Sequence, residues 1–231
     1  MPYPNADFWS ALKSGVRVAG DAGKPYALSV VTCGLLKLPS GQLVACDPFA
    51  GLQPKNNLFV QVPPGSYEVK VTLADVSDAL DGSHIREAYA TLIIDPIAQE
   101  LRRRIITPLP DGKTAPPEIA ADGTYYGFPV DAGTACFVDN QAIATSMPDG
   151  DWYNEVFDNG TPDSWFSLMD HSKSLRDGIA NIVLPLAKNG ENIVICHSGW
   201  GDGRYPVIGS YDEKDRLIAV HIDFMVVFRD A

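Results

Sequence analysis

Four aspartates carry the chemistry that this chain most plainly offers. Asp47, Asp131, Asp202 and Asp223 stand at or near the ends of apolar, strand-like runs. A buried carboxylate must be paired, hydrogen-bonded or bound to a metal ion. If three of them converge, they can hold a divalent cation that activates water, as in a metal-dependent hydrolase. If they do not, Asp47 and Asp202 accept turn amides, the usual role of aspartate, and Asp223 pairs with an arginine such as Arg204.

The second feature is a glycine-rich segment, residues 196–206, that follows the apolar run 193–195. Its glycines alternate with Trp200 and Asp202. Glycine is placed where the backbone needs a positive φ or a close approach to another group. A turn of this kind presents an aromatic ring and a carboxylate at a fixed place, which suits recognition of a ligand. The candidate ligand-binding residues are therefore Asp47, Asp131, Trp200, Asp202, Arg204, Tyr205 and Asp223.

Other common sites find no support in the sequence. The four histidines are scattered and lack the close ligand pairs of a zinc site. Ser198 lacks the flanking glycines of a hydrolase nucleophile, since Cys196 and Trp200 occupy those positions. The alternating glycines lack the pattern of a phosphate-binding loop. No cofactor follows, apart from a divalent cation under the hydrolase hypothesis.

Composition limits the class of partner. Eighteen Lys and Arg stand against 29 Asp and Glu, a net charge of −11. This balance argues against nucleic acid and against an anionic membrane as the main partner, and it suits a basic protein. The sequence shows no signal peptide and no apolar run of about 20 residues that could span a bilayer. Its four widely spaced cysteines predict reduced thiols in a cytoplasmic protein.

Strand-like runs outnumber helical ones. We predict a single domain over residues 1–231 that is mainly β with minor α+β character. It would be an antiparallel β sandwich or a strongly curved sheet with short peripheral helices. Residues 1–25 are expected to form a helical or extended lead-in, residues 140–147 a helix, and the acidic stretch 148–163 a surface loop. Residues 217–228 read as a central strand. Three hairpins are predicted: 28–38 with 42–46, 58–62 with 67–73, and 179–186 with 192–196 around Asn189-Gly190.

Several motifs together resemble the bacterial and fungal family known as domain of unknown function 4241. They include residues 45–49, 62–65, 130–134 and 198–203, in that order and spacing. The likeness runs from about residue 30 to the C-terminus. It implies no established activity, but the four aspartates all fall within the matching motifs.

We expect a soluble cytoplasmic recognition module that binds a small polar ligand or a partner protein through the glycine-rich turn. An immunity-like role against a basic toxin belongs to this class. The alternative is the divalent-metal-dependent hydrolase. A third hypothesis makes every motif residue part of the scaffold and assigns function to the acidic loop 148–163. The sequence does not set the oligomeric state.

Overall fold

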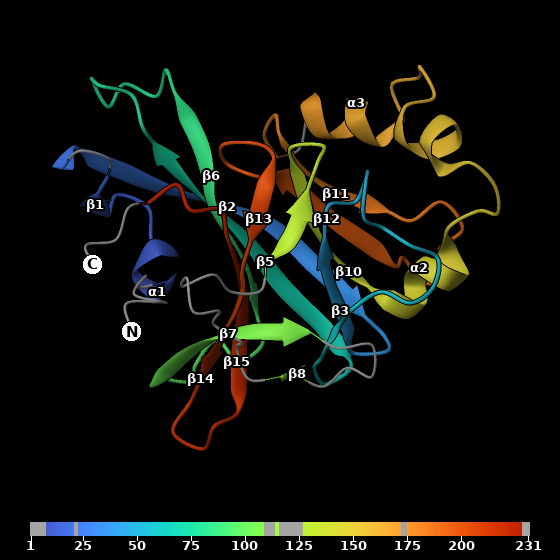
Figure 1. Cartoon of the computed structure of the whole chain (residues 1–231), viewed down its shortest axis with the longest axis horizontal. Helices are drawn as coiled ribbons and strands as arrows, with labels where there is room; N and C mark the ends of the chain where they lie inside the picture. The colour runs from blue at the N-terminus through green and yellow to red at the C-terminus, as the bar shows by residue number, and fades with distance from the viewer. Residues whose placement is uncertain (1–7, 21–22, 109–113, 116–126, 172–174, 228–231) are drawn as a thin grey trace.

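The computed structural model describes residues 8–20, 23–108, 114–115, 127–171 and 175–227. Its largest element is a strongly curled, antiparallel sheet of eight strands (Figure 1). The strand order across this sheet is β1 (Arg17–Ala19), β2 (Pro25–Leu38), β5 (Gly65–Asp75), β6 (Ile85–Ile93), β15 (Leu217–Asp223), β14 (Val207–Tyr211), β7 (Arg102–Pro108) and β8 (Thr114–Ala115).

A second antiparallel sheet lies beside it. Its order is β11 (Ile179–Val183), β12 (Asn192–His197), β10 (Thr134–Asp139), β3 (Gln42–Cys46) and β4 (Val60–Gln61). A short third sheet pairs β13 (Gly203–Tyr205) with β9 (Phe128–Val130). The helices are α1 (Phe8–Ala11), α2 (Asn140–Ser146), the π-helical turn η2 (Tyr153–Phe157) and α3 (Trp165–Asp170). The predicted fold class, mainly β with a curved antiparallel sheet and short helices, is confirmed.

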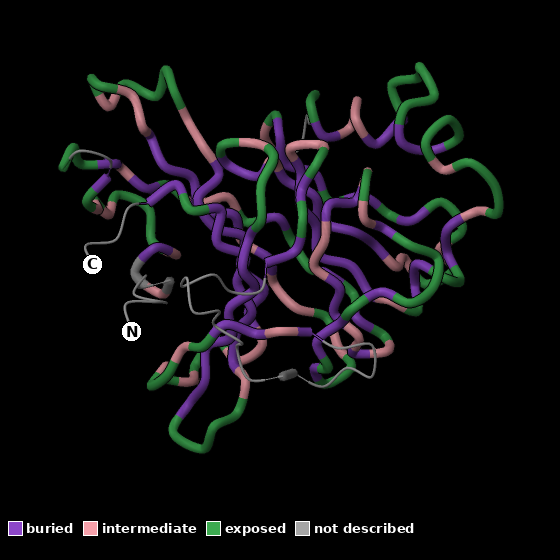
Figure 2. Tube along the Cα trace, viewed as in Figure 1, coloured by how far each residue is buried: buried purple, intermediate pink, exposed green. Residues whose placement is uncertain are grey.

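The five-stranded sheet is buried on both faces, which explains why its strands are apolar without clear alternation. In β12, Val194 and Cys196 belong to the core shared with the eight-stranded sheet. Ile193 and Ile195, on the opposite face, belong to a second core. Residues of α2, η2 and α3 complete this second core. The molecule is therefore layered as sheet, sheet and helices, and the buried trace follows the strands (Figure 2).

Two of the three predicted hairpins are wrong. β2 pairs with β5 in the large sheet, whereas β3 pairs with β4 in the smaller one. The chain thus changes sheets after β2 and again before β5, and the two crossings lie together because the Val62 N–H donates to the Gly41 carbonyl. The Ser40 N–H and hydroxyl donate to Asp139, which fixes the first crossing to the smaller sheet.

The third hairpin, the central strand and the helix at 140–147 are confirmed, whereas the stretch 148–163, predicted to be a surface loop, contains the turn η2 with Val156 and Phe157 buried. Residues 1–7 and 21–22 of the predicted lead-in lie outside the described residues. β11 and β12 form the third hairpin, and β15 lies in the interior of the large sheet between β6 and β14. Asp139 accepts the backbone N–H groups of Gln141 and Ala142 and so caps α2. No helix of the described residues is long and apolar enough to cross a membrane.

Candidate functional site

Asp47 is a hydrogen-bonded anchor inside the protein. Its side chain is completely buried. One carboxylate oxygen accepts the backbone N–H groups of Asp131 and Ala132 at 2.9 and 2.8 Å. The other accepts the Thr134 hydroxyl at 2.7 Å and the Phe49 N–H at 3.1 Å. With four donors in place, this carboxylate is satisfied by its own chain and holds loop 131–134 against the end of β3.

The glycine-rich turn is joined to the same loop. The Asp202 carboxylate, on an exposed residue, accepts the Gly133 N–H at 3.0 Å. The hydroxyls of Ser198 and Tyr205 both donate to the Gly201 carbonyl. Tyr205 is buried, and this desolvation raises the pKa of its phenol. The alternative interpretation of Asp47 and Asp202 as acceptors of turn amides is therefore confirmed.

The remaining predicted site residues differ in burial and make separate contacts. Trp200 is 53% exposed, and the Arg86 guanidinium lies 5.2 Å from its ring centroid. Arg204 is exposed and donates to the Gly127 carbonyl, so it is not the partner that the sequence assigns to Asp223. Asp223 is completely buried and accepts the Met225 N–H.

Asp47, Asp131 and Asp202 thus meet at one loop, but they meet through backbone amides. Within the described ranges, no group of three or more His, Cys, Asp or Glu side chains is arranged to hold a metal ion. Whether the glycine-rich turn binds a ligand stays a prediction.

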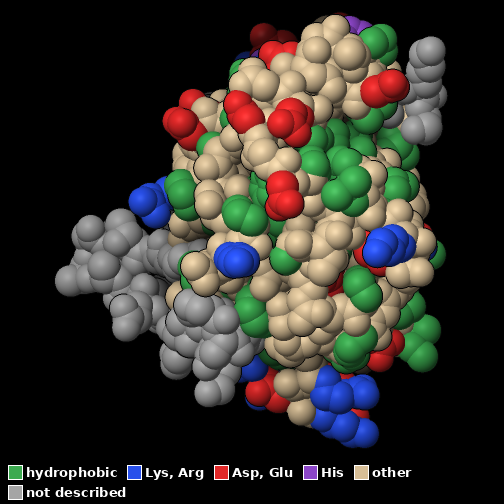
Figure 3. Space-filling view, turned by 90° about the vertical axis from the view of Figure 1, so that its right-hand side faces the viewer, with side chains coloured by type: hydrophobic (Ala, Val, Ile, Leu, Met, Phe, Trp, Pro, Cys, Tyr) green, Lys and Arg blue, Asp and Glu red, His purple; other side chains and the backbone are tan. Residues whose placement is uncertain are grey.

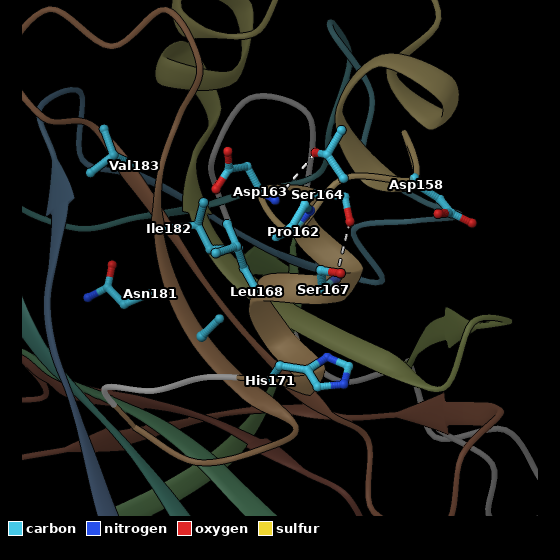
Figure 4. Close-up of a pocket in the computed structure, with 13 residues that line it drawn as sticks. Asp158, Pro162, Asp163, Ser164, Ser167, Leu168, His171, Asn181, Ile182 and Val183 are labelled. Carbon is cyan, nitrogen blue, oxygen red and sulfur yellow. Dashed lines mark hydrogen bonds between the residues drawn. The ribbon is translucent and has the colours of Figure 1, made fainter.

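A groove lies elsewhere, along the outer side of β11. It has a volume of about 880 Å³ and runs between this strand, α3 and the loop that precedes α3 (Figure 4). We call it the edge groove. The side chain of Ile182 points towards Leu168, whereas Asn181 and Val183 point away from the helix. A smaller hollow of about 320 Å³ shares Asp163, Leu168, Ile182 and Val183 with it, so the two are continuous along the strand.

Two buried aromatic side chains anchor the wall of the groove opposite β11, which is the loop that precedes α3. Phe157 and Trp165 are buried in the second core with their ring centroids 5.2 Å apart. Between them the chain turns at Gly160, whose φ is +72°, and the Asn159 side chain accepts the N–H and hydroxyl of Thr161. Ser164 then caps α3 by accepting the Ser167 N–H. These contacts fix the wall while its polar side chains stay in solvent.

The edge groove is acidic. Asp158 and Asp163 line it, Glu155 lines the adjoining hollow, and all three residues are exposed. No described Lys or Arg lines either hollow. The face that carries the helices shows several Asp and Glu side chains beside hydrophobic ones in its upper half, and Lys and Arg together with further Asp and Glu lower down (Figure 3).

The sequence predicts the acidic stretch that lines this groove, but it does not predict the groove. Residues 148–163 hold five carboxylates and no Lys or Arg, which is visible in the sequence. That this stretch faces the outer edge of β11 follows from the strand order, which no local pattern sets.

Comparison with known proteins gives one match. A family model described as "Protein of unknown function (DUF4241)" matches residues 36–222, most of the chain, and confirms the resemblance carried by the sequence motifs. No curated protein and no solved structure matches the chain.

Proposed function

We propose that this chain, which belongs to the DUF4241 family, is a recognition module that binds a basic segment of a partner protein in the edge groove. The observation that carries the proposal is an open groove with an apolar floor and carboxylates on its wall. Its volume of about 880 Å³ falls within the range of sites that hold ligands. The floor includes Leu168 and Ile182.

Lysine and arginine side chains match this arrangement. Their aliphatic stems cover apolar surface while the charged head stays in water. A stem lying on Leu168 and Ile182 would bring its head towards Asp158 or Asp163. The net charge of −11 adds a long-range attraction that speeds encounter with a basic partner.

The cytoplasmic location belongs to the same proposal. All four cysteines are free, including Cys46 and Cys136, whose sulfur atoms lie 3.7 Å apart. The reducing compartment of the proposal would keep these thiols free. The metal-dependent hydrolase finds no comparable support, since Asp47 already accepts four hydrogen bonds.

The test is a fluorescence anisotropy titration with a labelled octapeptide of alternating Lys and Val. A peptide of alternating Glu and Val is the control for charge. We expect the Lys peptide to bind and the Glu peptide not to bind. Raising the ionic strength from about 0.1 M to about 1 M shortens the Debye length from about 10 Å to about 3 Å, and this should weaken the complex.

Two double variants locate the site. Asp158→Asn with Asp163→Asn removes two groove charges, and neither carboxylate makes a hydrogen bond among the described residues. Each exposed charge pair contributes about 0.5 kcal/mol, so the dissociation constant should rise about fivefold. The control, Asp78→Asn with Glu213→Gln, removes two exposed charges outside the groove and should change it much less. Equal effects of the two variants would refute the groove as the binding site.

A further inference from the structure

The backbone of β11 is open on its outer side. In the register with β12, the Leu184 N–H donates to Glu191 and the His197 N–H donates to Gly178. Hydrogen-bonded and non-hydrogen-bonded pairs alternate along an antiparallel ladder. The N–H and C=O groups of Ala180 and Ile182 therefore face β12, whereas those of Asn181 and Val183 face outwards. Among the described residues, nothing pairs with these outward backbone groups.

The edge groove follows this open backbone. Four consecutive residues of β11, 180–183, line it. Successive side chains of a strand point to opposite faces, so four in a row border one hollow only when the hollow runs along the edge of the sheet. At about 3.4 Å per residue, the open edge has room for several residues of an extended chain.

We infer that the basic segment binds by adding a sixth strand to the smaller sheet, next to β11; this inference rests on the proposed function. The backbone groups of Asn181 and Val183 would pair with the segment. Its side chains would then alternate. One set would face Leu168 and the carboxylates of Asp158 and Asp163, where Lys or Arg fits. The other set would lie beside Val183, which is 61% exposed and suits a β-branched residue. Strand addition of this kind takes its affinity from main-chain hydrogen bonds and its specificity from alternate side chains.

The sequence preference follows from this geometry. The partner segment should alternate basic residues with Val, Ile or Thr over about four to six residues. A segment with the same charge on consecutive residues would place half of its basic side chains away from the carboxylates. Proline within the segment should be excluded wherever its missing N–H would face β11.

Two substitutions at one position separate strand pairing from side-chain contact. Val183→Pro removes the outward N–H and keeps the ladder with β12, because edge strands tolerate proline where the N–H faces away from the sheet. Val183→Ala removes the side chain and keeps the N–H. We expect Val183→Pro to weaken binding of the Lys–Val octapeptide about tenfold, and Val183→Ala to weaken it about twofold. Thermal unfolding of each variant checks that the fold is kept.

Methylation of the peptide backbone is the second measurement. N-methyl groups are placed on the Lys residues of one octapeptide and on the Val residues of another. In a paired strand, alternate N–H groups face the neighbour, so one of the two peptides should lose binding and the other should keep it. A purely electrostatic complex would respond equally to both.

The outcomes distinguish the inference from the function on which it rests. If the octapeptide binds and the Asp158 and Asp163 substitutions weaken it, while Val183→Pro and both methylated peptides leave binding unchanged, strand addition is overturned and the acidic groove stands. If the octapeptide does not bind the wild-type chain, the proposed function and the strand pairing both fail.

Discussion

Replacing Asp47 should destabilise the protein by releasing loop 131–134 from the end of β3. Its two carboxylate oxygens together accept three backbone N–H groups and the Thr134 hydroxyl. Thr134 is 1% exposed, and Asp47 is completely buried. In Asp47→Ala these donors lose their acceptor, and water can reach only the N–H groups of Asp131 and Ala132. Asp47→Asn keeps the shape but replaces one accepting oxygen by a donating NH₂ group, which faces two donors.

The magnitude follows from the number of bonds. A hydrogen bond to a charged group contributes about 1.5 to 3 kcal/mol, and neighbouring contributions are not additive. Allowing for partial hydration of Asp131 and Ala132, we expect Asp47→Ala to lower the free energy of unfolding by about 4 kcal/mol. Asp47→Asn should lower it by about 3 kcal/mol. Thr134→Val removes one donor to this carboxylate and should cost about 2 kcal/mol. For a chain of this size, about 4 kcal/mol lowers the melting temperature by about 8 to 16 °C.

Urea unfolding followed by tryptophan fluorescence measures these changes. An unchanged slope against urea shows that the same cooperative transition is being compared. If Asp47→Asn stays within about 1 kcal/mol of the wild type, Asp47 is not the anchor described above. The same experiment with Mg²⁺, Mn²⁺ or Ca²⁺ tests the hydrolase alternative. A bound cation at 100 times its dissociation constant would stabilise the protein by about 2.7 kcal/mol, and that gain would vanish in Asp47→Asn.

Two further predictions concern the scaffold. His221 is buried between the hydroxyls of Thr91 and Ser210, and burial lowers its pKa from 6.5 to about 3. As the pH falls, the unfolded chain protonates His221 before the folded protein does. The stability that neutral His221 contributes is therefore complete above pH 6.5 and is lost as the pH falls towards 3, by up to about 1.4 kcal/mol per pH unit. Urea titrations from neutral to acid pH should show that the free energy of unfolding depends less on pH in His221→Gln than in the wild type. Gly199 has a φ of +67°, and a Cβ there would lie 2.7 Å from Val226 Cγ2 and 2.9 Å from the Glu87 carbonyl oxygen. Gly199→Ala should therefore lower the free energy of unfolding by about 3 kcal/mol. Gly201 has a φ of +103° but open space around it, so Gly201→Ala, its matched control, should cost only about 1 kcal/mol; equal melting temperatures for the two variants would contradict the packing argument.

The parts of the fold that the sequence predicts are those with a local cause. The β11–β12 hairpin, the interior strand β15 and helix α2 each follow from signals within a few residues, such as the cap that Asp139 gives to α2. Gly133, with a φ of +63°, lies in the turn just before β10. Local chemistry decides these elements whatever the rest of the chain does.

The two wrong hairpins have a different origin. Proline and glycine between two strands indicate that the chain turns, but they do not say whether it returns along the same sheet or passes to another. Here the choice depends on the bond from Ser40 to Asp139, which are 99 residues apart. The partners of Asp47 are likewise 84 to 87 residues away, apart from Phe49. Sequence reasoning named both roles for this aspartate, and only the tertiary fold decides between them.

The described contacts divide the polar residues into two sets with different capacities. Asp47, Ser198 and Tyr205 direct their polar atoms to the backbone of their own chain, so they shape the glycine-rich turn and leave few groups for a ligand. The carboxylates of Asp158 and Asp163 are exposed, yet the wall that bears them is anchored through Phe157 and Trp165. A groove whose wall is already fixed loses less conformational entropy when a peptide binds than a flexible loop does. If the proposed function holds, this fixed acidic wall explains how the groove could recognise a short basic strand with only a few contacts.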